Sequence, residues 1–406
     1  MASPNLSNAA AIVGAAEADV IGYREELTGH KATSLQLHIE AINNVCKYTG
    51  IPIADIQGVF SAGWTGELAE HLGIHPRYLD TTSVGGCSFQ IHVHHALAAI
   101  HAGIIDIALV SHGEAGWSYR GGGGGGGGRG GGQISPGAEM TMAYGTFGAP
   151  SQYAHAMVRH FHDYGTTLED FAHIAVVTRD WAQLNPRAVM YGKAQSPFGG
   201  PITVQDVVDA RIIAWPLTLY NCCLVTDHGG AVIVARPEIA RDLATNPVWI
   251  TGAGESIGHQ NMVEMEDFTA TSASRSSATA YEMAGMGPDD MEMAMIYDSF
   301  TITAAITAEM LGLAPRGKGY TLWKNGDAAQ GGRLPINTSG GGLSFNHSGM
   351  YGMQLLVEAY RQLSRTAEDG VNGIEGKQTN ATTCIVNGTG GTLSTTGTLV
   401  LTSDDR

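Results

Sequence analysis

The sequence SVGGCSFQIHVHHALAAIHAGI, residues 83–104, followed by DIALVSHGEAG, residues 106–116, indicates how this chain folds. The first stretch is a glycine turn that opens a helix, and the second is a buried strand that leads into a polar loop. Before them, AAAIVGAAEAD at 9–19 and DIQGVFSAG at 55–63 have the pattern of strands, separated by a helix-like pattern, SLQLHIEAINNVCKYTG, that ends at Gly50. This order of strand, helix, strand, helix and strand predicts an α/β fold with a parallel sheet.

The same order occurs a second time further along the chain. PVWITGAGES at 247–256 resembles the first strand and its turn, and MEMAMIYDSF at 291–300 stands where the second strand stood. SFNHSGMYGMQLLVEAYRQL at 344–363 is again a glycine turn that opens a helix, and TTCIVNGTGG at 382–391 matches the third strand and its loop. We therefore expect one α/β unit to occur twice.

The expected halves are residues 1–236 and residues 247–406. The first half contains a long insertion, at about 112–220, with a helix rich in aromatic and histidine residues, QYAHAMVRHFHDYG. Insertions of this size usually form a cap over a site. We expect a duplicated core with a capping insertion.

A glycine-rich tract, RGGGGGGGGRGGGQ at 120–133, lies inside the insertion. It lacks the G-K-[ST] of a phosphate loop, and pure glycine loses the most conformational freedom on ordering, so the tract predicts a flexible loop. The alternative is a mobile lid beside the site, with Arg120 or Arg129 reaching a substrate phosphate.

Composition excludes some classes of partner. The 22 basic and 38 acidic residues give a formal net charge of −16, which argues against nucleic acid. The five cysteines are few and odd in number, which indicates a reducing compartment and a cytoplasmic location. The N-terminal stretch has no basic region before its short apolar run, and no run of about 18 apolar residues occurs, so we expect no contact with a membrane.

Metal binding is not expected. The spacing C-x2-C is absent, and the histidines of the helix that follows Cys87 have no acidic or cysteine ligand in register. These histidines are His92, His94, His95 and His101.

Cys87 is the first candidate for a catalytic residue. It should lie in the first turn of a helix, where unpaired N–H groups and the helix dipole favour a thiolate, and Gly85 and Gly86 let the backbone approach a bound acyl group. The alternative is that Cys87 is a small buried residue that only packs.

Three further places in the sequence offer candidates, and pseudo-symmetry between the halves would bring the first of them, His347, across from Cys87. His347 lies in the matching glycine turn of the second half, where it can act as a general base or polarise a carbonyl. Tyr297 and Asp298 end a strand; the aspartate can also cap a helix, and a buried tyrosine can simply satisfy one hydrogen bond. The loop at Asn387 and Gly388 can supply backbone donors to an oxyanion, or form a plain turn.

These features together resemble the thiolase superfamily. The motifs are the glycine turn with its cysteine, LVTDHGGAVIV, in which Asp227 closes a turn before the last strand of the first half, IYDSF, RLPINTSGGGLSFNHSG and VNGTGG. More narrowly, the chain resembles the sterol-carrier-protein type of thiolase and its relatives in steroid side-chain degradation. The resemblance covers nearly the whole chain.

The resemblance implies a five-layered αβαβα fold, normally a homodimer, that acts on acyl-CoA thioesters in lipid metabolism. No bound cofactor is implied, because coenzyme A enters as part of the substrate. In the family, a cysteine at the mouth of the helix takes the acyl group and the histidine of a G-H-P turn activates it. His347 matches that histidine, with Asn346 and Ser348 in place of the glycine and proline.

This chain departs from the family pattern at two cysteines. One is the nucleophile, and the other lies in a later C-x-G loop and handles the α-proton in the family. Counted from the helix and the strand after it, the family nucleophile falls on Gly86, one residue before Cys87. The second cysteine has no match, since Asn387 and Gly388 stand in its loop. We assign Gly86, Asn346, Ser348, Asn387 and Gly388 to the oxyanion or substrate.

The resemblance therefore implies alternative functions. In the first, a thiolase-like acyltransferase, His347 deprotonates Cys87 and the thiolate attacks a carbonyl. In the second, a retro-aldolase, Tyr297 or His347 removes the hydroxyl proton of a 3-hydroxyacyl-CoA, and a small partner with a zinc ribbon and an OB fold binds coenzyme A. In the third, the chain is a scaffold subunit without activity.

Overall fold

The computed structural model describes most of the chain, namely residues 5–119, 136–143, 145–146, 148–367 and 376–404. The glycine-rich tract, with Arg120 and Arg129, lies outside the described residues.

In the described part of the chain, nine strands form one sheet, in the order β3-β2-β4-β7-β1-β8-β11-β10-β9. The bounds are β1 Ala11–Glu17, β2 Gly58–Phe60, β3 Tyr78–Asp80, β4 Ile107–Ala115, β7 Asp227–Ala235, β8 Val248–Ile257, β9 Met293–Ile296, β10 Thr383–Gly390 and β11 Thr395–Thr402. β1 and β8, the first strands of the two halves, pair with each other and run antiparallel. They join the two half-sheets.

The repeat predicted from the sequence is visible in the strand order. Outward from the junction, the first half has its first, last, third and second strands, β1, β7, β4 and β2. Outward from the junction, the second half also has its first, last, third and second strands, which are β8, β11, β10 and β9. Only the edge strand β3 has no counterpart among the described residues.

The sheet is mixed, so the prediction of a parallel sheet is wrong in part. β2 pairs parallel with β3 and β4, and β9 pairs parallel with β10, as helix crossovers require. β7 and β11 run antiparallel to both of their neighbours within each half. The reason is the connection: β11 follows β10 through a tight turn, and β7 follows the long insertion, so neither is reached through a single crossover helix.

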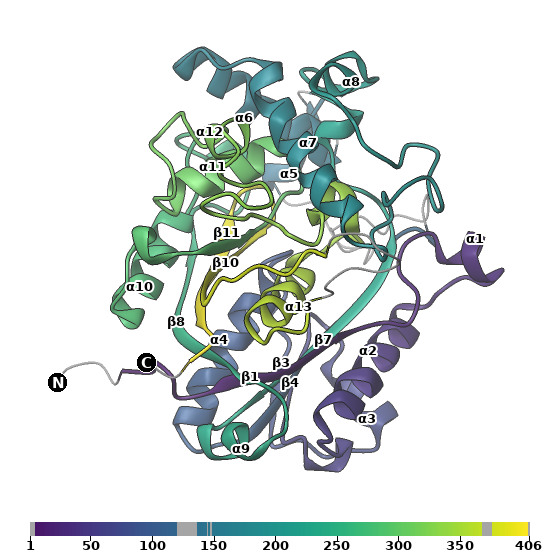
Figure 1. The fold of residues 1–406 in the computed structure, drawn as a ribbon, viewed down its shortest axis with the longest axis vertical. Coiled ribbons are helices and arrows are strands. Elements are labelled where there is room, and N and C mark those ends of the chain that lie inside the picture. The colour runs from purple at the N-terminus through teal and green to yellow at the C-terminus, as the bar shows by residue number, and fades with distance from the viewer. Residues whose placement is uncertain (1–4, 120–135, 144, 147, 368–375, 405–406) are drawn as a thin grey trace.

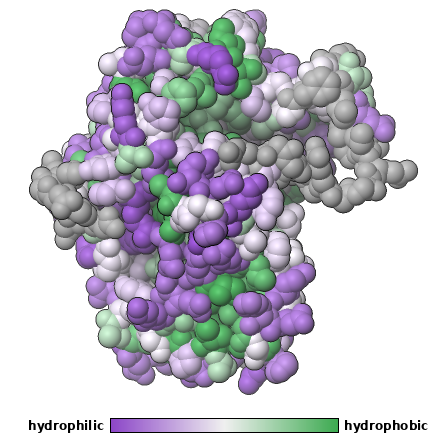
Figure 2. All heavy atoms as spheres, turned by 90° about the vertical axis from the view of Figure 1, so that its right-hand side faces the viewer, coloured by the Kyte–Doolittle hydropathy of each residue, from purple (hydrophilic) through white to green (hydrophobic). Residues whose placement is uncertain are grey.

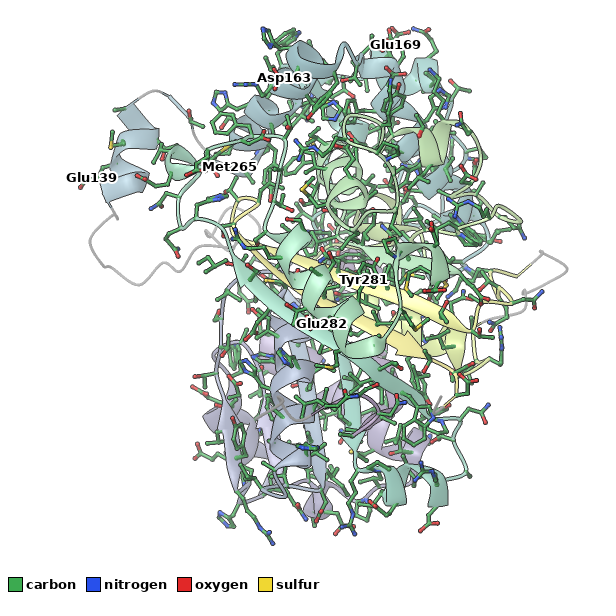
Figure 3. All side chains as sticks on the ribbon, turned by 90° about the vertical axis from the view of Figure 1, so that its left-hand side faces the viewer. Glu139, Asp163, Glu169, Met265, Tyr281 and Glu282 are labelled. Atoms are coloured by element: carbon green, nitrogen blue, oxygen red, sulfur yellow. The ribbon has the colours of Figure 1, made fainter. Side chains whose placement is uncertain are left out.

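Helices complete a five-layered arrangement (Figure 1). α4 and α13 contact each other and strands of both half-sheets, so they form the central layer. α2 covers the outer face of β1, β4 and β7, and α10 covers that of β8 and β11. Figure 3 shows α10 in front of the strands of the second half, marked by its labelled Tyr281 and Glu282.

The helices of the core have the following bounds: α1 Arg24–Thr28, α2 Ser34–Thr49, α3 Thr65–Leu72, α4 Ser88–His101, α9 Pro237–Asp242, α10 Ala273–Ala284, α11 Thr301–Met310, α12 Thr321–Lys324 and α13 Gly352–Leu363. Shorter helical turns are η1 Ile53–Asp55, η2 Leu219–Asn221, η3 Met262–Glu264, η4 Pro288–Asp290 and the π-helical η5 Gly341–Phe345.

Helix α2 shows how the sequence sets an element. Thr33 caps its start by accepting a hydrogen bond from the backbone N–H of Gln36, and Gly50 ends it in the left-handed conformation, as predicted. Its buried side chains, spaced by three and four residues, include Leu37, Ala41 and Val45. This apolar face packs onto β1, β4 and β7.

The insertion between β4 and β7 contains α5 Pro136–Ala143, α6 Gly148–Tyr164, α7 Leu168–Gln183, α8 Val204–Asp209, β5 Ile212–Ala214 and β6 Leu217–Thr218. α6 and α7 pack against α11, and α7 also packs against η5 (Figure 1). Large hydrophobic side chains remain exposed here, among them Phe198, Ile212 and Trp215. Figure 2 shows hydrophobic patches on the upper part of one face.

None of the described helices has the length and apolar character needed to cross a bilayer.

A buried carboxylate links β1 to three other parts of the fold. Glu17 on β1 contacts Arg361 of α13 at 2.9 Å, Arg187 of the insertion at 3.2 Å and His228 of β7 at 3.5 Å. Burial alone raises the pKa of Glu17, but Arg361, Arg187 and His228 outweigh burial and hold this pKa well below its ordinary value of 4.5. The carboxylate is therefore ionised in the folded chain.

We expect Glu17→Gln to lower the free energy of unfolding by about 1.5–3 kcal/mol at neutral pH, because it removes charged hydrogen bonds from a buried site. Since the folded-state pKa is depressed, this contribution is present above pH 4.5 and is lost as pH falls through the folded-state value. Urea denaturation at several pH values measures it. Asp163→Asn, at an exposed pair with Arg159 (Asp163 is labelled in Figure 3), is the control and should leave stability nearly unchanged. An equal loss in both variants would contradict the prediction.

Candidate active site

Tyr297 and His347 are in direct contact with each other. Tyr297 directly follows β9, and His347 lies between η5 and α13. The Tyr297 hydroxyl is 3.2 Å from His347 Nε2, and both side chains are buried. A phenol and an imidazole in direct contact can pass a proton between them.

The turn before α13 also holds the Tyr297 hydroxyl. The backbone N–H of Tyr351 donates to it at 3.0 Å, and the hydroxyl is 3.4 Å from the carbonyl oxygen of Gly349. The Tyr351 ring stacks on His347, with ring centroids 5.9 Å apart. The hydroxyl position is therefore fixed from several directions.

Burial sets the protonation state of this pair. It lowers the pKa of His347 to about 4, so the imidazole is neutral at pH 7. It raises the pKa of Tyr297 well above 10, so the phenol keeps its proton. At neutral pH, the pair therefore consists of a phenol and an imidazole with one nitrogen free to accept.

Gly86, at the mouth of α4, lies directly against the Tyr297 ring. A Cβ atom built at residue 86 would be 2.2–2.4 Å from Cε2, Cζ and the hydroxyl oxygen of Tyr297. Real Cβ atoms do not approach other atoms so closely. The tyrosine ring thus occupies the space that any side chain at residue 86 would need.

Cys87 lies where it was predicted, directly before α4, but it is fully buried. Burial raises the pKa of its thiol to about 12, so burial outweighs the effect of the helix terminus and the thiol stays protonated at pH 7. The thiol donates to the Val84 carbonyl oxygen, 3.9 Å from Sγ. Among the described residues, no hydrogen bond links Cys87 to His347.

The remaining predicted binding residues lie around this pair in different settings. Asn387 and Gly388 lie inside β10 rather than in a loop, which corrects the prediction, because β11 pairs with β10 as far as Gly390. Ser348 Oγ is 3.5 Å from His112 Nε2. Asn346 is fully buried, and within the described structure neither polar atom of its side chain has a partner. The oxyanion and substrate roles of these residues stay predictions.

Two aspartates support the surrounding turns. Asp298 accepts hydrogen bonds from the backbone N–H groups of Gly342 at 2.7 Å and Leu343 at 3.4 Å, so it holds η5, and burial raises its pKa to about 7. Asp227 accepts from the backbone N–H and the hydroxyl of Ser118, at 2.9 and 2.6 Å. This contact holds the start of the insertion against β7.

Sequence reasoning missed Glu114 and His112, at the end of β4. Glu114 accepts a hydrogen bond from the backbone N–H of Met350 at 2.9 Å, and His112 Nε2 is 3.4 Å from the Glu114 carboxylate. The signal was present in the sequence: the polar run SHGE ends a strand that is otherwise apolar. It was described only as a polar loop.

One histidine of α4, His95, lies between two carboxylates that the sequence analysis did not identify. His95 Nδ1 is 2.6 Å from Asp80 of β3, and Nε2 is 3.3 Å from Glu255 of β8. Asp80 and then Glu255 raise the pKa of His95 to about 9. These carboxylates come from other elements, so the spacing along the helix could not show them. In the described ranges, no group of His, Cys, Asp and Glu is arranged to hold a metal ion.

Known proteins share this architecture. The family model described as thiolase C-terminal domain-like matches residues 254–403. The steroid side-chain-cleaving aldolase of Thermomonospora curvata is 32% identical over 385 residues, which cover 89% of this chain and 92% of that protein. The chain belongs to the thiolase superfamily.

Other relatives agree with this assignment. The 17-hydroxy-3-oxo-4-pregnene-20-carboxyl-CoA lyase of Mycobacterium tuberculosis is 29% identical over 401 residues. The match covers 91% of this chain and 95% of that protein. The solved structure of the Ltp2-ChsH2(DUF35) aldolase superposes with a TM-score of 0.85, at 28% identity and 99% coverage of both chains. The predicted resemblance, the thiolase-like fold and the assignment to an enzyme of this superfamily are confirmed.

The close contact between Gly86 and Tyr297 in this thiolase-superfamily chain can be tested by a double-mutant cycle. We expect Gly86→Ala and Tyr297→Ala each to lower stability, the first by displacing the ring and the second by leaving a cavity. The double variant should lose less stability than the two single losses added together, by about 0.5–3 kcal/mol, because the clash is then absent. Gly66→Ala, on the exposed side of α3 with open space around it, should combine additively with Tyr297→Ala. Additivity at Gly86 would contradict the contact.

Proposed function

We propose that this chain is a retro-aldolase that cleaves a 3-hydroxyacyl-CoA without a covalent acyl-enzyme. The observation that carries the proposal is the position of the Tyr297 ring, which fills the space of a side chain at residue 86. If residue 86 is the position of the family nucleophile, then a protonated phenol lies where a thiolate would otherwise attack.

The reaction needs a base and an acid, and the site offers one pair that can serve as both. The substrate hydroxyl proton moves to the Tyr297 oxygen as the Tyr297 proton moves to His347 Nε2, 3.2 Å away. The hydroxyl carbon becomes a carbonyl, the bond between the α- and β-carbons breaks, and its electron pair forms the thioester enolate. The enolate then takes back one proton at the α-carbon, so the products are a ketone or aldehyde and a shorter acyl-CoA.

Protonation states support this assignment of roles. Tyr297 cannot act as a base alone, because its pKa lies well above 10; it needs an acceptor for its own proton. His347 is neutral at pH 7 and supplies that acceptor. Acyl transfer, by contrast, needs a thiolate at Cys87, where burial raises the pKa of the thiol to about 12.

Coenzyme A enters as the thioester of the substrate, and the steroid class is our proposal for the acyl group, supported by the names of the T. curvata and M. tuberculosis relatives. We also propose a small partner with a zinc ribbon and an OB fold, supported by the two-component name of the Ltp2-ChsH2(DUF35) aldolase. The homodimer, the cytoplasmic location and the division into halves at 236 and 247 remain part of the proposal.

The test is turnover by the purified chain, alone and with a co-encoded partner. The substrate is 17-hydroxy-3-oxo-4-pregnene-20-carboxyl-CoA, and the ketone and shortened acyl-CoA are measured by liquid chromatography and mass spectrometry. We expect Tyr297→Phe to lower kcat by about 100-fold or more, since general acid–base catalysis contributes factors of this size. Cys87→Ala should keep kcat within a few-fold of wild type.

The opposite pattern would favour the acyltransferase: loss of activity in Cys87→Ala with activity kept in Tyr297→Phe. Absence of turnover in wild type, both alone and with the partner, across this substrate and simple 3-hydroxyacyl-CoA thioesters, would favour the scaffold.

A further inference from the structure

The turn that holds the Tyr297 hydroxyl is itself held by one carboxylate from the other half of the fold. We infer that Glu114 is a positioning residue for the reaction: it fixes the turn at 348–351 and thereby the hydroxyl of Tyr297. This inference rests on the proposed function, because it assigns Glu114 a role in the reaction attributed to Tyr297.

The contact between Glu114 and the turn is close and directional. Glu114 Oε2 accepts the backbone N–H of Met350 at 2.9 Å. A Cβ atom at Gly349 would be 2.3–2.7 Å from the carboxylate, and φ of Gly349 is +135°. Only glycine fits this position, because a side chain would strain the backbone and displace the carboxylate. The turn is therefore shaped around Glu114.

The same turn contacts the reacting hydroxyl on both sides of Met350. The Gly349 carbonyl oxygen is 3.4 Å from the Tyr297 hydroxyl, and the Tyr351 N–H donates to it at 3.0 Å. The peptide group between Gly349 and Met350 therefore donates its N–H to Glu114 and presents its carbonyl oxygen to Tyr297, and the next peptide group donates to Tyr297. A shift of the turn would move the hydroxyl relative to His347, and misplacement by about 1 Å can lower a rate by about 100-fold.

Glu114 is in turn oriented by its neighbours. His112, two residues earlier on β4, has Nε2 at 3.4 Å from the carboxylate and at 3.5 Å from Ser348 Oγ. The turn is therefore held at Ser348 and at Met350 by two side chains of one strand. The negative charge of Glu114 also adds to burial in raising the pKa of Tyr297, which keeps the proton on the hydroxyl.

Two variants separate positioning from general stability. Glu114→Ala removes the acceptor for Met350, and we expect kcat to fall about 10-fold or more with KM nearly unchanged. Glu114→Gln keeps an acceptor oxygen at the same distance, and it should recover most of kcat. The control is Glu255→Gln: this carboxylate lies on β8 and pairs with His95 of α4, and its loss should leave kcat unchanged. Equal losses of kcat in Glu114→Ala and Glu114→Gln, or a loss confined to KM, would overturn the inference.

Hydrogen exchange gives a second measurement that does not depend on turnover. We expect peptides that cover 346–352 to exchange faster in Glu114→Ala than in wild type, with wild-type exchange in Glu114→Gln and Glu255→Gln. Unchanged exchange in Glu114→Ala would overturn the inference even if the chain is active. If wild type lacks turnover but exchange responds as expected, the proposed function has failed while Glu114 still fixes the turn, and its role in the reaction falls with the function.

Discussion

The contact between the Tyr297 ring and Gly86 is the constraint on which the chemistry of this chain depends. Because the ring occupies the space beside residue 86, that position holds no side chain, and the mouth of α4 presents a phenol instead. Burial of this site also keeps the phenol of Tyr297 protonated and the imidazole of His347 neutral. This contact is the basis of the proposed non-covalent reaction, since a covalent acyl-enzyme would need a thiolate at this place.

The architecture explains how such distant residues meet. α4 and α13 lie between the two half-sheets, so the starts of both helices and the ends of β4, β9 and β10 converge at one point. Glu114 comes from the first half, and Tyr297, His347 and the turn at 348–351 come from the second. The Met350 to Glu114 hydrogen bond therefore joins the halves at the place where the reaction would occur.

Much of this could be predicted from the sequence. The duplicated order of strands and helices and the end of α2 at Gly50 follow from periodicity and glycine positions. Tyr297 and His347 are predicted as site residues, but their direct contact with each other is not. The direction of β7 and β11 could not be predicted, because it depends on connections that do not contain a crossover helix. Nor could the partners of His95 and the role of Glu114, because these contacts join residues from different elements. The pKa of Cys87 depends on burial, which the helix position alone did not reveal.

The most direct test of the central claim is intact-protein mass spectrometry of the wild-type chain, with its partner, sampled during steady turnover of a 3-hydroxyacyl-CoA and after incubation with acyl-CoA thioesters. We predict the unmodified mass throughout, while ketone and shortened acyl-CoA accumulate. An added acyl mass that disappears in Cys87→Ala would contradict the account, because it would show that a covalent intermediate forms on the thiol.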